Sequence, residues 1–138
     1  MIRKALLACL LAAATACALA HEEPDEEPMA PQEDRFTGTV ERVVDGDTFR
    51  LRGVDESVRI WGLDAPERCD PAGPAATTML KRLISGQPVN CQLRDIDRYQ
   101  RLVGQCFLTD GRDIAAVMIA SGVATEYCRY SRGHYGSC

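Results

Sequence analysis

The sequence has no hydrophobic run long enough to cross a membrane. Its longest uncharged apolar stretch, residues 5–19, has 15 residues, whereas a membrane-spanning helix needs about 20. The stretch follows a short basic start, Arg3-Lys4, and ends in Ala18-Leu19-Ala20, a small-x-small cleavage pattern. We therefore predict that residues 1–20 are a signal peptide and that the protein is secreted or periplasmic.

Two alternatives for this segment are weaker. A short core helix would need a polar face, and the run offers none. Lipid anchoring at Cys17 would normally require a larger aliphatic residue where Ala14 stands. We expect no stable membrane association.

The part of the chain expected to fold also lacks an excess of positive charge. Residues 35–138 carry 14 Lys or Arg and 13 Asp or Glu, which argues against broad electrostatic coating of nucleic acid. The net charge of −4 comes from residues 21–34, which hold seven carboxylates and no Lys or Arg. Acids and prolines alternate there with almost nothing to bury, so we predict that residues 21–34 are disordered. The predicted domain covers residues 35–138.

No Cys-x-x-Cys pair is present, which argues against a zinc site. Without the signal peptide, the chain keeps an odd number of cysteines: Cys69, Cys91, Cys106, Cys128 and Cys138. Export makes disulfides the default interpretation. One thiol must then stay free or pair between molecules.

The apolar pattern predicts five short strands and two helices. Alternation or apolar runs indicate strands over residues 39–44, 47–52, 57–63, 89–94 and 102–108. A spacing of three and four from Ala75 predicts a helix that Gly86 and Pro88 end. A second helix is predicted over residues 114–121, with Asp113 as its N-cap. Five strands with an inserted helix are typical of the oligonucleotide-binding-fold barrel, an α+β, mainly β, architecture.

A hairpin between the last two predicted strands would bring two cysteines together. Cys91 and Cys106 flank a polar loop over residues 95–100, and the midpoint of their numbers falls inside that loop. We predict a cross-strand disulfide between them. Of the other cysteines, we favour Cys69 bonding to Cys128 or Cys138.

Three segments carry residues suited to chemistry. In the first, Asp45-Gly46-Asp47-Thr48, a simple turn is the alternative, since Asp-Gly is a common turn dipeptide. However, Asp47 shares the parity of Phe49 and Leu51, so its carboxylate should point toward the barrel mouth. A carboxylate near an apolar interior favours a cation.

The second segment, RIWGLDAPE, places Asp64 and Glu67 on a loop stiffened by Pro66, five residues after Arg59. Carboxylates and a backbone carbonyl suit a hard cation such as Ca²⁺, and arginine suits phosphate. The third, DRYQR, offers Arg98, Tyr99 and Arg101 for phosphate and base contacts. A loop with solvated acids and a polar hairpin tip are the alternatives for these two segments.

In this order and at these separations, VVDGDTF, RIWGLDAPE and DRYQR resemble the thermonuclease family, whose best-known member is staphylococcal nuclease. The resemblance covers roughly residues 37–131. It implies Asp47, Asp64 and the carbonyl of Ala65 as ligands of Ca²⁺. It also implies catalytic Arg59, Glu67 and Arg101, with Glu67 as general base or water-orienting group. Nucleotide contacts are implied for Arg98, Tyr99 and Tyr127.

Two departures from the family pattern stand out. Gln100 replaces a glycine, which costs on the order of 1 kcal/mol or more if that position has positive φ. The family also has a helix after the segment that matches residues 126–131, and we expect that helix to be missing here.

The resemblance implies a calcium-dependent endonuclease acting on DNA and RNA with little sequence preference. It would cleave the 5′ P–O bond and leave 3′-phosphate ends, and we expect it to act as a monomer. A non-catalytic nucleic-acid- or protein-binding module on the same fold is the main alternative, and an exported small-ligand or cell-envelope binding protein is a weaker one. The joint presence of Asp47, Arg59, Asp64, Glu67 and Arg101 favours the enzyme.

Overall fold

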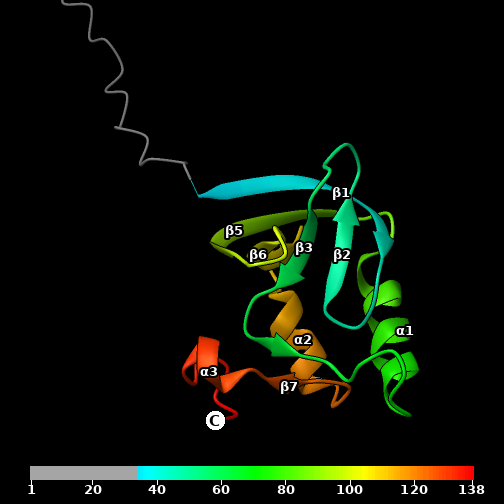
Figure 1. Ribbon diagram of the computed structural model, residues 1–138, viewed down its shortest axis with the longest axis vertical. Coiled ribbons are helices and arrows are strands. Elements are labelled where there is room, and N and C mark those ends of the chain that lie inside the picture. Colours follow the sequence, from blue (N-terminus) through cyan, green and yellow to red (C-terminus); the bar gives the residue numbers. More distant parts are fainter. Residues whose placement is uncertain (1–33) are drawn as a thin grey trace, which may run out of the picture. The chain divides into compact units, whose positions relative to one another are not determined.

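Five strands close into a barrel in the order β1-β2-β3-β6-β5. The computed structural model describes residues 34–138 (Figure 1). The barrel strands are β1 (Arg35–Val43), β2 (Thr48–Leu51), β3 (Ser57–Ile60), β5 (Pro88–Ile96) and β6 (Leu102–Leu108). The predicted signal peptide and all but the last residue of the predicted disordered segment lie outside the described residues, so both stay predictions. Within residues 34–138, no helix has the length and apolar character to span a membrane.

One parallel pairing closes the barrel. β3 and β6 run parallel, with Val58 opposite Leu102 and Arg59 opposite Val103. The other four barrel pairings are antiparallel. The predicted five-stranded, mainly β oligonucleotide-binding fold is therefore confirmed.

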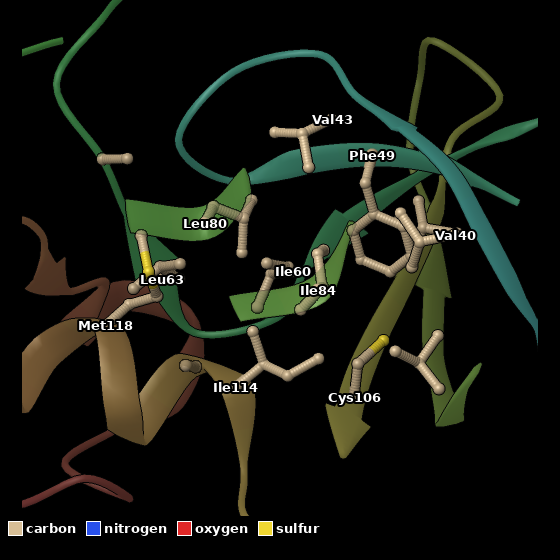
Figure 2. Packing of buried hydrophobic residues seen from close by; sticks show 14 of the residues in the cluster. Val40, Val43, Phe49, Ile60, Leu63, Leu80, Ile84, Cys106, Ile114 and Met118 are labelled. Carbon is tan, nitrogen blue, oxygen red and sulfur yellow. The ribbon is translucent and has the colours of Figure 1, made fainter. Parts of the chain in front are cut away.

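The core fills the barrel and the space beneath it. Phe49 and Ile60 point inward from β2 and β3, and both are fully buried. Helices α1 (Gly73–Ile84) and α2 (Ile114–Ala120) add Leu80, Ile114 and Met118 to the same cluster (Figure 2). Each such side chain contributes about 1.5–3 kcal/mol on burial.

Local sequence signals set the helix ends. The Asp113 side chain accepts hydrogen bonds from the backbone N–H groups of Ala115 and Ala116, at 2.9 and 3.3 Å, so the predicted N-cap is confirmed. Helix α1 ends at Ile84, and Gly86 follows at φ +68°, a conformation that glycine adopts without strain.

A second, two-stranded sheet lies outside the barrel. β4 (Leu63–Asp64) pairs with β7 (Thr125–Glu126), and the one-turn helix α3 (Cys128–Ser131) follows. The sequence predicted a single strand over residues 57–63, but the chain breaks between β3 and β4. Gly62 has φ +70° there, and a Cβ on it would lie 2.8 Å from the Tyr135 ring.

The disulfides confirm one prediction and correct the other. Cys91 and Cys106 lie opposite each other on β5 and β6 and are bonded, with their Cα atoms 4.0 Å apart. The predicted bond from Cys69 is wrong, because Cys128 bonds to Cys138 and Cys69 is free and exposed. The second bridge therefore closes a loop within the C-terminal segment.

Glu126 anchors that segment. Its carboxylate, in a residue only 6% exposed, accepts hydrogen bonds from the Ser131 hydroxyl and from the backbone N–H groups of Tyr135 and Ser137, at 2.5, 3.0 and 2.7 Å. Burial alone would raise the pKa of Glu126, but these hydrogen bonds more than offset it and hold the pKa below its usual value.

We expect Glu126→Gln to destabilise the fold at pH 7, because the amide cannot accept all three bonds. A lowered carboxyl pKa contributes stability above the unfolded value of about 4.5, and that stability is lost as pH falls through the folded pKa. The difference between the two proteins in urea unfolding should thus shrink from pH 7 to pH 3. Glu41→Gln, at an exposed site on β1, is the matched control and should show no such trend. A difference that persists at low pH would contradict this account.

Candidate active site

One cleft of about 880 Å³ gathers every residue that the sequence singled out. It lies between the β1–β2 turn, the segment from β3 to α1, the tip of the β5–β6 hairpin, and the C-terminal residues around α3. Its lining includes all nine candidates: Asp47, Arg59, Asp64, Ala65, Glu67, Arg98, Tyr99, Arg101 and Tyr127. Residues from four separate parts of the chain thus share one surface.

A glycine allows the β1–β2 turn to sit close to its neighbours. A Cβ on Gly46 would lie 2.7 Å from the Ala65 Cβ and 2.8 Å from the Ala76 Cβ, closer than side chains can approach. The turn therefore packs directly on the loop after β4 and on α1. This contact fixes the position of Asp47, the next residue.

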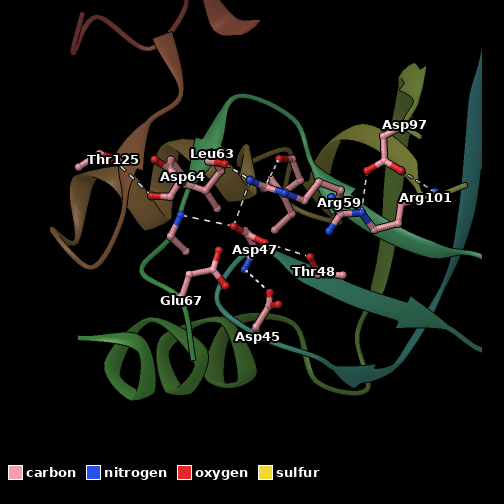
Figure 3. A network of polar contacts seen from close by, with 12 residues as sticks. Asp45, Asp47, Thr48, Arg59, Leu63, Asp64, Glu67, Asp97, Arg101 and Thr125 are labelled. Carbon is pink, nitrogen blue, oxygen red and sulfur yellow. Dashed lines mark hydrogen bonds and ion pairs between the residues drawn. The ribbon is translucent and has the colours of Figure 1, made fainter. Parts of the chain in front are cut away.

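Asp47 and Arg59 form a half-buried ion pair. The Arg59 Nη2 lies 3.1 Å from the Asp47 Oδ2, and the two side chains are 15% and 14% exposed. Nη1 of Arg59 donates to the carbonyl oxygens of Ile60 and Leu63, at 3.1 and 2.9 Å. The Ala65 N–H donates to the Asp47 Oδ2 at 3.4 Å. Several contacts therefore hold both charged groups in place (Figure 3).

The Asp47 end of the cleft carries more negative charge than Arg59 neutralises. Burial raises the pKa of Asp47 from 3.8 to about 6; Arg59 opposes the increase and Asp45 adds to it. The Glu67 carboxylate points toward Asp47 from below (Figure 3), and Asp64 lines the same cleft. A divalent cation would relieve this excess, and oxygen donors are what Ca²⁺ binds.

The acids of the cleft do not form a compact ligand set by themselves. Within residues 34–138, the trio with ligand atoms all within 4.8 Å of one another is Glu126, Cys128 and Cys138, and its cysteines are bonded to each other. Asp47, Asp64 and Glu67 do not form such a trio, so their carboxylates are not all within that distance of one another.

Glu67 is held by its backbone while its side chain stays exposed. Its N–H donates to the Asp70 side chain at 3.1 Å, and its carbonyl accepts from the Asp70 N–H at 2.9 Å. A Cβ on Gly73 would lie 2.0 Å from the Glu67 carbonyl oxygen, so only glycine fits at the start of α1. The loop therefore presents a free carboxylate from a fixed backbone.

Asp97 organises the β5–β6 hairpin tip. It accepts from the Arg101 Nε at 2.7 Å and from the backbone N–H groups of Tyr99 and Arg101, at 2.9 and 3.0 Å. Gln100 has φ +62°, so the position where the family pattern has glycine is left-handed, which is the condition under which glutamine is strained there. Arg101 keeps both of its Nη groups for other partners.

Tyr99 is 64% exposed, and the Arg98 guanidinium lies 4.8 Å from its ring centroid. Tyr127 is held in place because its backbone N–H donates to the Gly62 carbonyl at 2.8 Å.

Sequence reasoning missed Arg129 and Tyr130, which line the same cleft from α3. A signal was present, because Arg129-Tyr130 repeats the basic-aromatic pair Arg98-Tyr99, but the pattern alone does not show where α3 lies.

Comparison with known proteins shows the family of this chain. The model of a family described as "Staphylococcal nuclease homologue" matches residues 57–137, so the chain belongs to that family. It is 36% identical over 96 residues to an "Uncharacterized endonuclease" of Escherichia coli O157:H7, covering 68% of this chain and 63% of that protein. A "Micrococcal nuclease" of Shigella flexneri is 30% identical over 107 residues, covering 70% and 62%.

A third relative carries a different name. The "Succinoglycan biosynthesis protein ExoI" of Rhizobium meliloti is 33% identical over 108 residues, covering 69% of this chain and 54% of that protein. The chain thus spans less than two thirds of the length of each of these relatives.

The left-handed conformation of Gln100 gives a stability prediction. Gln100→Val should lower the free energy of unfolding by about 1 kcal/mol or more, because a β-branched residue is strained at positive φ. Gln100→Gly should unfold at an equal or higher urea concentration than the parent. Gln87→Gly, at an exposed position without positive φ, is the control and should be slightly destabilising. A Gln100→Gly variant less stable than Gln87→Gly would contradict the conformation.

Proposed function

We propose that this protein is a calcium-dependent endonuclease that hydrolyses phosphodiester bonds of DNA and RNA with little sequence specificity. The observation that carries the proposal is the convergence of Asp47, Arg59, Asp64, Glu67 and Arg101 on one cleft. The family and two relatives named as nucleases support the same chemistry. A non-catalytic binding module has no need of this combination.

The residues of the cleft fit a calcium ion. Asp47 and Asp64, with the backbone carbonyl of Ala65, would hold it. The raised pKa of Asp47 and the nearby Asp45 favour a cation at this position. When bound, calcium supplies positive charge beside the phosphoryl oxygens.

Arg59 is prepared to bind a phosphate. A guanidinium has five N–H donors, and two on Nη1 and one on Nη2 are engaged with Ile60, Leu63 and Asp47. The donors left over are on Nε and Nη2, which form an edge suited to two phosphate oxygens. Because the engaged donors fix the guanidinium, little reorganisation is needed as charge develops in the transition state.

Glu67 and Arg101 complete the reaction. The free Glu67 carboxylate accepts a proton from a water molecule, whose oxygen then attacks phosphorus. The bond to the 5′ oxygen breaks, the 5′ oxygen takes up a proton from solvent water, and the phosphate stays on the 3′ side. Glu67 then returns its proton to solvent. Arg101, held through its Nε by Asp97, directs its Nη groups to the phosphoryl oxygens.

The protein is proposed to act outside the cytoplasm. The predicted signal peptide over residues 1–20 supports export to the periplasm or the medium. Two disulfides in the described part of the chain are compatible with an oxidising compartment.

Removing the catalytic groups should reduce turnover and leave the fold intact. We expect Arg59→Ala, Glu67→Gln and Arg101→Ala each to lower kcat by at least ~100-fold, because preorganised charge at a transition state is worth a few kcal/mol per group. Initial rates on plasmid DNA and on RNA measure the effect. Arg52→Ala, an exposed arginine outside the cleft, should match the parent. Near-normal turnover in all three variants would show that the catalytic assignment is wrong, whereas a parent protein that cleaves neither substrate would favour the binding-module alternative.

Metal dependence is the second test. We expect digestion in Ca²⁺, weaker digestion in Mg²⁺, which demands a more regular octahedral site, and none in excess chelator. Ca²⁺ should also raise the melting temperature of the parent protein and of the exposed-site control Asp55→Asn. It should have little effect on Asp47→Asn, which lacks a proposed ligand. Undiminished digestion in chelator would rule out the metal assignment.

A further inference from the structure

The two disulfides differ in their exposure. Cys91 and Cys106 are completely buried between β5 and β6, whereas Cys128 and Cys138 are both exposed. Thiol–disulfide exchange requires a thiolate to reach a sulfur atom, so an exposed disulfide opens and closes more readily than a buried one. A mild thiol reductant should therefore open the Cys128–Cys138 bond and leave the barrel bond closed.

The exposed bond closes a segment that has little regular structure of its own. Residues 132–138, which follow α3, form no helix or strand, and Arg132, Gly133 and Gly136 have positive φ. A backbone with such glycines loses much conformational entropy when it is ordered. The Cys128–Cys138 bond restricts the open conformations of the segment and so favours the ordered one.

The ordered segment packs on the turn between β3 and β4. The Tyr135 ring lies against Gly62, where a Cβ would come within 2.8 Å of it, and the centroids of the Tyr135 and Trp61 rings are 6.0 Å apart. The Tyr135 hydroxyl donates to the Asp113 carboxylate at 3.0 Å, and its backbone N–H donates to Glu126 at 3.0 Å. Tyr135 is therefore held at both ends while its ring supports the turn.

This turn sets the orientation of Arg59. The Arg59 Nη1 donates to the carbonyl oxygens of Ile60 and Leu63, at 3.1 and 2.9 Å, and the two residues that Tyr135 supports lie between them in the chain. Tyr135 does not itself line the cleft. Its effect on the site must therefore pass through the backbone that holds Arg59.

We propose that the Cys128–Cys138 bond is a redox switch, and that the nuclease becomes active when this bond forms. In the reduced protein, residues 132–138 leave the turn, and the carbonyl acceptors of Arg59 lose their support. The guanidinium then no longer meets the phosphate in a fixed orientation. This inference rests on the proposed nuclease function and adds a control to it.

The oxidation requires only a disulfide as oxidant, such as glutathione disulfide or the cysteine pair of an oxidoreductase. One thiolate of the protein attacks this disulfide and releases one of its sulfurs as a thiol. The second thiolate then attacks the mixed disulfide, closes the Cys128–Cys138 bond and releases the other sulfur as a thiol. The protein thus loses two electrons and two protons, and the oxidant takes them up.

The predicted export gives the switch a direction. Thiols stay reduced in the cytosol and are oxidised outside it, so a chain exported as we predict would become active only after it leaves the cytoplasm. The nucleic acid of the producing cell would be spared.

Turnover of the full chain before and after selective reduction tests the switch. A dithiol is added until the Cys128–Cys138 bond is open and the Cys91–Cys106 bond intact, as peptide mass spectrometry shows. We expect kcat on plasmid DNA in Ca²⁺ to fall at least about tenfold, because displacing a catalytic group by about 1 Å can cost more than that. Reoxidation with glutathione disulfide should restore it.

Two variants are controls for the reduction. Cys128→Ser/Cys138→Ser should match the reduced parent and should not respond to the dithiol. Cys69→Ser removes an exposed cysteine but keeps the bond, so it should match the oxidised parent. If the double-serine variant does not fold, the reduced and reoxidised parent still gives the comparison. Full turnover in the reduced parent overturns the inference.

A mutant cycle shows whether the bond acts through Arg59. In an Arg59→Ala background, opening the bond should change kcat by less than about twofold, whereas in Arg101→Ala the fall of at least about tenfold should persist, because groups that act through one another are not additive. A general loosening of the fold would lower kcat in both backgrounds. An equal loss in both therefore overturns the inference.

The fluorescence of Trp61 gives a readout that does not depend on cleavage. Trp61 is the only tryptophan of the chain, and its ring contacts those of His134 and Tyr135. Selective reduction should therefore increase the quenching of its emission by acrylamide, and unchanged quenching overturns the inference. Increased quenching in a protein that cleaves nothing in either redox state supports the redox-controlled release of the segment and defeats the proposed function.

Discussion

The ion pair between Asp47 and Arg59 is the contact around which the cleft is organised. Asp47 directly precedes β2 and Arg59 lies in β3, so the pair joins these two strands. Arg59 also donates to the Leu63 carbonyl and Asp47 accepts from the Ala65 N–H, which ties both residues to the segment that follows β3. A partly buried ion pair of this kind adds little to stability, since desolvation offsets much of the attraction. The raised pKa of Asp47 shows that desolvation outweighs Arg59 here. The arrangement is thus better explained by the chemistry it prepares than by the stability it provides.

The cleft combines charges of both signs. Carboxylates and arginines line it together: Asp45, Asp47, Asp64 and Glu67 with Arg59, Arg98, Arg101 and Arg129. The arginines are therefore concentrated where they can act, in a domain whose total charge is nearly balanced. A cation held by the acids and the arginines of the cleft would bind phosphates, and the rest of the surface need not be basic.

Sequence and structure agree where the signal is local. Alternation around Phe49 located β2, and the Cys91–Cys106 pairing followed from the centre of one hairpin. The three motifs contain eight of the nine candidate residues, and only Tyr127 lies outside them. The failures have different causes. Gly62 breaks a predicted strand where Tyr135, 73 residues later, packs on it. Cys69 was expected to bond to Cys128 or Cys138, but these two cysteines, separated by only 10 residues, bond to each other.

The packing of Tyr135 on Gly62 also links the C-terminal residues to the proposed catalytic site. The carbonyls of Ile60 and Leu63 accept from Arg59, and Trp61 lies between these two residues in the chain. The Trp61 ring contacts the rings of His134 and Tyr135, with centroids 5.3 and 6.0 Å away. The Tyr127 N–H holds the Gly62 carbonyl in the same turn. The backbone that fixes the Arg59 guanidinium is therefore braced by residues 126–138, which Glu126 and one disulfide hold together. Loosening this segment would disturb both α3, whose residues Arg129 and Tyr130 line the cleft, and the orientation of Arg59.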